Sequence, residues 1–173
     1  MSRARWTRVF LWFSVTGWGI GLGAKLFDLL VLASAWGANP PASLALYPYG
    51  RSWPINPGNF FQPLSALMVI GLIGALVSGW KTEPGYRFWL WMPVAAFALI
   101  WIATPTVFWP LIGELYRVAH GTITRTDAEV RTLVLHWFIY DWLRIAVIAA
   151  GFFSVVRSIS LPYAERQSTG ARN

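Results

Sequence analysis

One segment in the last third of the chain places several chemically versatile side chains at helical spacing. His136, Tyr140 and Arg144 follow one another at intervals of four residues, so a helix at about 100° per residue would bring them onto one face. Trp137 and Asp141 lie at the edge of that face. The residues after Arg144 are almost wholly apolar, which predicts that the helix runs from water into a membrane. An ionised Asp and an ionised Arg inside a membrane are costly, so they need either partners or a task.

Two further ionisable residues lie at matching depth on the first apolar stretch. With a rise of about 1.5 Å per residue, Lys25 and Arg144 each lie about 4–5 Å outward from the middle of the bilayer, and Asp28 and Asp141 about 9 Å. The first and fourth helices run antiparallel, so we expect one neutral cluster. In it, Lys25 would pair with Asp141. A second pair would join Asp28 to Arg144.

Two interpretations of this cluster remain open. In the functional one, the charges form a polar pocket in the outer leaflet, with His136 and Tyr140 one turn above it. In the structural one, they form an ion-pair network that holds the helices in register. Replacing the charges in pairs would separate the two interpretations.

The composition indicates an integral membrane protein with a single domain, residues 1–173. Hydrophobic residues make up 56% of the chain and charged residues only 12%, against about 25% charged residues in soluble domains. The net charge of +7 is explained largely by a basic N-terminus and by arginines that flank the membrane. No base-stacking motif accompanies it, so we expect no nucleic-acid partner. The absence of cysteine excludes disulfides and thiol chemistry within this chain.

Four apolar stretches are long enough to span a bilayer, and they predict an all-α, integral membrane four-helix bundle. Thr126 and Glu129 form a T-x-x-E capping box at the start of the fourth helix. Pro105 and Pro110 should bend the far end of the third helix, which continues beyond the bilayer to Gly121. The fourth helix likewise begins in water, and the polar tail is predicted to be disordered. The predicted spans are residues 9–36, 60–80, 87–110 and 135–157, and the tail is residues 161–173.

A long loop, residues 37–58, connects the first two spans and contains five prolines, which forbid a continuous helix. Its length favours a cap or lid over one end of the bundle, and an ordered loop that packs on itself is an equally good interpretation. Arg51, Trp53 and Asn56 are its side chains best suited to bind a ligand. Asn59 would cap the second helix.

The distribution of Lys and Arg predicts the orientation in the membrane. The N-terminal arm, the turn after the second span and the C-terminal end hold eight of these residues, and the opposite side holds four. Cytoplasmic segments carry the excess of Lys and Arg. Both termini are therefore predicted to be cytoplasmic, with the long loops facing outward.

The glycines of the first span form two G-x-x-x-G spacings, Gly17 with Gly21 and Gly19 with Gly23. Such spacing lets another helix approach closely. Packing inside the bundle is favoured over a dimer interface, and a homo-oligomer remains the alternative.

Neither a metal nor a cofactor is expected from the sequence. His120 and His136 are the only histidines, and His120 falls in an extramembrane turn, which disfavours haem ligation by both at one depth. No spacing such as H-x-x-x-H supports a metal site. No phosphate-binding loop and no G-x-S-x-G motif occurs.

The second half of the chain resembles a family of small four-helix membrane proteins that includes the anthrone oxygenases and was long classed as a domain of unknown function. The matching segments are TPTVFWPLIGEL, DAEV and HWFIYDWLR. The fourth helix of the family carries a W-x-x-x-N-x-x-R-like pattern, which Trp137, Asp141 and Arg144 overlay with Asp in place of Asn. Trp109 and Gly113 stand where the third helix of the family carries asparagines.

The resemblance implies a cofactor-independent oxygenase that converts an anthrone into an anthraquinone. O2 would react with a substrate carbanion made by a catalytic base, His136 or Asp141. A cation, Arg144 or Lys25, would hold the enolate or phenolate. The alternative is a non-catalytic membrane protein whose charges are structural and whose loops bind a partner. The expected partners are the lipid bilayer and a lipophilic aromatic molecule, bound by Lys25, Asp28, Tyr140, Trp137, Arg51 and Asn56.

Overall fold

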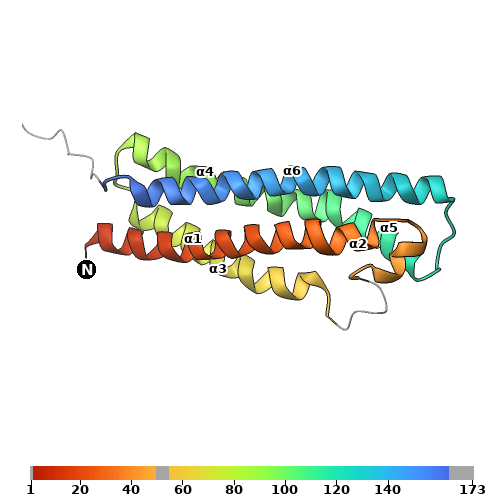
Figure 1. The fold of residues 1–173 in the computed structure, drawn as a ribbon. Coiled ribbons are helices and arrows are strands. Elements are labelled where there is room, and N and C mark those ends of the chain that lie inside the picture. Colours follow the sequence, from red (N-terminus) through yellow and green to blue (C-terminus); the bar gives the residue numbers. More distant parts are fainter. Residues whose placement is uncertain (1, 50–54, 164–173) are drawn as a thin grey trace, which may run out of the picture.

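The computed structural model describes residues 2–49 and 55–163, and in this part of the chain the long helices run alongside one another (Figure 1). No strand occurs among the described residues. The predictions for Arg51, for Trp53 and for most of the C-terminal tail lie outside them. In chain order the elements are α1 (Arg3–Phe27), the π-helical η1 (Asp28–Ala33), α2 (Ser34–Trp36), the 3-10 helix η2 (Ala42–Leu46), α3 (Pro57–Ser78), α4 (Pro84–Ala103), the π-helical η3 (Thr104–Phe108), α5 (Trp109–Ala119) and α6 (Asp127–Ser160).

Among the described residues, four continuous helical stretches are long and apolar enough to cross a membrane, with mean hydropathies of 1.4 to 2.1. α1, η1 and α2 join into one such stretch, and α4, η3 and α5 join into another. These stretches and α6 have 34, 36 and 34 residues, about 50 Å each, which exceeds a hydrocarbon core of about 30 Å. The predicted all-α four-helix architecture is confirmed.

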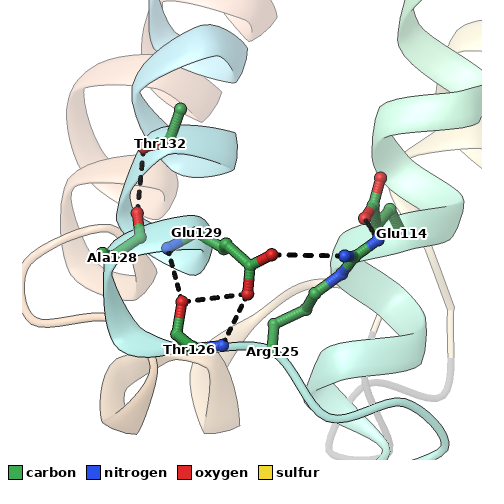
Figure 2. Close-up of polar contacts among 6 residues, drawn as sticks. All are labelled: Glu114, Arg125, Thr126, Ala128, Glu129 and Thr132. Carbon is green, nitrogen blue, oxygen red and sulfur yellow. Dashed lines mark hydrogen bonds and ion pairs between the residues drawn. The ribbon is translucent and has the colours of Figure 1, made fainter.

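The ends of the helices follow local sequence signals. Thr126 accepts a hydrogen bond from the backbone N–H of Glu129, whose carboxylate in turn accepts one from the backbone of Thr126 (Figure 2). This confirms the predicted capping box. The second helix begins earlier than predicted, because Asn56 is its N-cap and Asn59 closes a second box from the third helical position. Gly121, at φ +66°, stops α5 as predicted.

An ion-pair bridge ties α5 to the start of α6. Arg125 lies 2.6 Å from Glu114 of α5 and 3.4 Å from Glu129 of α6 (Figure 2). All three side chains are at least one quarter exposed, so the pairs contribute little energy.

The first helix lies between α3 and α6, and α6 in turn packs on α4. Glycines permit these close approaches. A Cβ atom on Gly17 would lie 2.8 Å from the side chain of Met68 on α3, and one on Gly19 would lie 3.3 Å from Phe152 on α6. The predicted packing inside the bundle is confirmed for Gly17 and Gly19. It is not found for Gly23, which is exposed and where a Cβ atom would meet nothing within 4 Å.

The bundle has two distinct ends (Figure 1). The terminal end holds the start of α1, the turn between α3 and α4, and the end of α6. The loop end holds α2, η2, α5 and the start of α6. A separate cluster of buried apolar residues lies toward each end.

Candidate functional site

An alternating series of charges joins the first helix to α6. Lys25 Nζ lies 2.6 Å from Asp28 Oδ2 and 3.0 Å from Asp141 Oδ2. The other oxygen of Asp141 accepts a hydrogen bond from Nη2 of Arg144. We call these four residues the ion chain. It carries two positive and two negative charges and is neutral overall.

The ion chain confirms one of the two predicted pairings. Lys25 pairs with Asp141 across the helices as expected. Asp28 pairs with Lys25 and Arg144 with Asp141, in place of the expected pair between Asp28 and Arg144. The reason is local, because residues three apart on a helix are neighbours and meet without spanning the gap between helices.

Three of the four residues of the ion chain are buried, and the side chain of the fourth, Arg144, is 15% exposed. Asp141 has no exposed surface, and Lys25 and Asp28 are 4% and 7% exposed. Burying an ion costs several kcal/mol, which only well-formed pairs can offset. An aromatic ring adds to the pairs, since the guanidinium carbon of Arg144 lies 3.8 Å from the ring centroid of Phe108, within cation–π range.

Both π-helical segments adjoin the ion chain. η1 begins at Asp28, and η3 ends at Phe108, whose ring lies against Arg144. π-Helical turns are rare and occur frequently at functional sites. Pro105 marks η3 in the sequence because it lacks a backbone N–H, and the π-helical segment lies at this proline, one of the two at which a bend was predicted. No residue type marks η1.

A pocket of about 280 Å³ opens beside the ion chain at the loop end, and we call it the loop-side pocket. Asp28 is the one ionisable residue among its described lining residues, and Asn56 is the other polar one. The other three residues of the ion chain do not line the pocket. They connect to it only through Asp28, which pairs with Lys25. The remaining walls are apolar: Ala24, Phe27, Leu32, Pro48, Ile55, Pro57, Phe60 and Phe61.

The buried face of α6 is rotated from the face that carries the predicted histidine and tyrosine. Trp137 and Asp141 are buried, and Lys25 Nζ lies 5.4 Å from the ring of Trp137. His136 and Tyr140 are exposed, with their rings 6.0 Å apart, and neither lines the loop-side pocket. The structure therefore joins Trp137 to the ion chain and leaves His136 and Tyr140 on the surface of α6.

Two loop tyrosines near Asp28 were missed from the sequence. Tyr47 is fully buried, and its hydroxyl has no hydrogen-bond partner in the described structure. Tyr49 packs against it, with ring centroids 5.5 Å apart. Burial, and then the charge of Asp28, raises the pKa of Tyr49 to about 12, and burial also raises the pKa of Tyr47. Both hydroxyls remain protonated at neutral pH, and the Y-P-Y spacing within an apolar loop is the signal that could have found them.

Within the described residues, no group of three His, Asp or Glu side chains could hold a metal ion. The arrangement instead offers a single carboxylate, backed by an ammonium group, at the wall of an apolar pocket. No family model matches this chain, and neither a curated protein nor a solved structure matches it.

Proposed function

We propose that this integral membrane protein binds a compact lipophilic aromatic molecule in the loop-side pocket, with the carboxylate of Asp28 accepting a hydrogen bond from a hydroxyl of the ligand. The observation that carries the proposal is a charged side chain in the wall of an otherwise apolar pocket. Ligand sites commonly combine apolar walls with a few convergent polar groups. The volume of about 280 Å³ lies near the lower end of the range for such sites, which favours a small ring system.

The chemistry of the walls narrows the ligand class. The rings of Phe27, Phe60 and Phe61 can pack against a flat aromatic molecule. A carboxylate accepts hydrogen bonds and cannot donate them, so Asp28 favours a phenol or alcohol and repels an anionic ligand. Lys25 does not line the pocket, and its Nζ lies 2.6 Å from Asp28 Oδ2, so this ion pair orients the carboxylate of Asp28. A phenolic polycycle fits these constraints.

The chemistry we propose for such a ligand resembles that of an anthrone oxygenase, with Asp28 as the base in place of His136 or Asp141. Asp141 is fully buried between two cations, and His136 does not line the pocket. When Asp28 takes a proton, the ion chain changes from neutral to a net charge of +1, which stabilises the carbanion left on the substrate. The proton comes from the CH2 group of the substrate. O2 would add to the carbanion and regain that proton from Asp28 as a hydroperoxide, which would lose one water by breaking its O–O bond and its remaining C–H bond to leave C=O.

The competing proposal is a non-catalytic membrane protein in which the ion chain only orders the helices. The specific observation in its favour is that every charge of the ion chain is already paired. In that case the loop-side pocket would hold only lipid chains.

Mass spectrometry of small molecules that copurify with the protein tests the proposal. Ala24 lines the pocket, so Ala24→Leu should fill it and reduce the retained aromatic compound at least about tenfold, since a blocked pocket loses most ligand contacts. The matched control is Ala95→Leu, at an exposed position on α4, which should retain the compound. Equal retention by both variants would eliminate the pocket as the binding site.

A second measurement separates binding from catalysis. Purified protein would be given an anthrone, and O2 consumption and anthraquinone formation would be followed for the wild type and for Asp28→Asn. Binding without turnover in the wild type would reject the oxygenase chemistry and leave the binding proposal standing. Turnover that persists in Asp28→Asn would reject Asp28 as the base.

A further inference from the structure

A second hollow, of about 530 Å³, lies at the terminal end of the bundle, and we call it the terminal-side hollow. It is formed where the first turns of α1 meet the segment that follows α6. Ser2, Ala4, Arg5, Arg8, Val9 and Trp12 line it from the first helix, and Pro162 and Tyr163 line it from the other side. This hollow is not part of the proposed aromatic site.

The polar part of the terminal-side hollow is strongly basic. Arg5 and Arg8 are three residues apart, which places them on one face of α1, and both are exposed. No carboxylate among the described residues forms an ion pair with either guanidinium. The first turn of α1 contributes further positive potential, and Ser2 caps it by accepting a hydrogen bond from the N–H of Arg5.

The same helix face changes from charged to apolar along its length. Val9 and Trp12 follow Arg5 and Arg8 on the lining of the hollow, and Trp12 is 61% exposed. Tryptophan is enriched where the apolar and polar parts of a membrane meet. The face therefore offers cations at the helix end and apolar surface about one turn farther into the membrane. This order matches an anionic lipid, whose charged headgroup lies outside its apolar acyl chains.

We propose that the terminal-side hollow binds the headgroup of an anionic phospholipid, with Arg5 and Arg8 contacting the phosphate and the acyl chains lying along Val9 and Trp12. Arginine suits this role because its planar guanidinium makes paired hydrogen bonds to phosphate oxygens. Basic pockets at the membrane surface bind anionic headgroups by this chemistry. A zwitterionic lipid would be bound less well, and a free phosphate would lack the apolar contacts.

Native mass spectrometry of the full-length protein in detergent tests this site. The protein would be titrated with phosphatidylglycerol and with phosphatidylcholine of the same acyl chains. Arg5→Gln combined with Arg8→Gln should weaken the first phosphatidylglycerol bound by about 25-fold, or about fivefold for each basic residue. Phosphatidylcholine should bind equally weakly to the wild type and to this variant.

The matched control removes the same charge from the same end. Arg3 and Arg157 are exposed and do not line the hollow, so Arg3→Gln combined with Arg157→Gln should weaken binding less than about threefold by general attraction alone. Equal losses in the two double variants would show diffuse attraction and overturn the proposal. So would displacement of the lipid by millimolar inorganic phosphate.

Two further variants show whether a loss of lipid binding comes from the lost contacts or from misfolding. Arg5→Lys combined with Arg8→Lys keeps the charge and should lose less affinity than the Gln pair. Trp12→Ala keeps both arginines and should weaken phosphatidylglycerol several-fold by removing apolar contact. A Trp12→Ala protein with unchanged lipid affinity would contradict the proposed path of the acyl chains.

Discussion

At the scale of single residues, Asp141 determines the stability of the ion chain. It is fully buried, and its two oxygens face Lys25 and Arg144. Without Asp141, the buried Lys25 and the partly buried Arg144 would share a single carboxylate, Asp28. The Lys25–Asp28 pair would remain at 2.6 Å, so the imbalance would fall on Arg144.

We therefore expect Asp141→Leu alone to destabilise the bundle by about 3–5 kcal/mol, because it breaks a buried ion-pair network and leaves the partly buried Arg144 unpaired. Asp141→Leu combined with Arg144→Met removes one charge of each sign and should recover most of that loss. Thermal unfolding in one detergent would measure both. Neither change touches the lining of the loop-side pocket, so the double variant should also retain the aromatic ligand proposed for it. A double variant less stable than Asp141→Leu would show that Arg144 has a role other than neutralising Asp141.

At the scale of elements, the sequence was sufficient to predict the helices and insufficient to predict how each is rotated. Hydrophobic length and the Thr126 capping box identify α6, yet His136 and Trp137 are adjacent and lie only about 100° apart around a helix. Which of them is buried depends on the neighbouring helices, and Trp36 packs against Trp137 with ring centroids 4.9 Å apart. The predicted partner of Asp28, Arg144, was wrong, because Lys25 lies one turn away on the same helical stretch and pairs with Asp28 first.

Only some of the close helix contacts could be predicted, because a contact depends on both helices. Gly17 and Gly19 could be identified from their spacing, but Gly151 stands alone in the sequence of α6. A Cβ atom on Gly151 would lie 2.4 Å from the indole ring of Trp18, which is fully buried. The contact depends on the position of α1 and so could not be read from α6 alone.

Gly151→Ala should accordingly destabilise the bundle by about 1–3 kcal/mol through overpacking against Trp18. Gly113→Ala is the matched control, because Gly113 lies within α5 and a Cβ atom there meets nothing within 4 Å. That control should stabilise by about 0.5–1 kcal/mol, since glycine is a poor helix former. Both values would come from thermal unfolding of the purified proteins. If the two variants shifted the midpoint in the same direction, the packing of α1 on α6 would not be as described.

At the scale of the whole molecule, the two ends of the bundle differ in charge and in the kind of hollow they carry. The loop end holds the loop-side pocket with its carboxylate. The terminal end holds the basic terminal-side hollow. Among the described residues, the terminal end carries one acidic residue, Glu83, against Arg3, Arg5, Arg8, Lys81, Arg87 and Arg157.

This asymmetry predicts that the terminal end faces the cytoplasm. Positively charged segments are retained on that side, where anionic lipids also attract them. A reporter inserted at Gly85, in the first turn of α4, should read as cytoplasmic, and one at Gly121, after α5, should read as external. A matched pair of insertions is informative because both lie at exposed glycines, so each reporter can fold outside the bilayer. An external signal at Gly85 would invert the topology and would place the terminal-side hollow in the opposite leaflet. The lipid titration in detergent would be unaffected by that inversion, so it tests the site separately from the orientation.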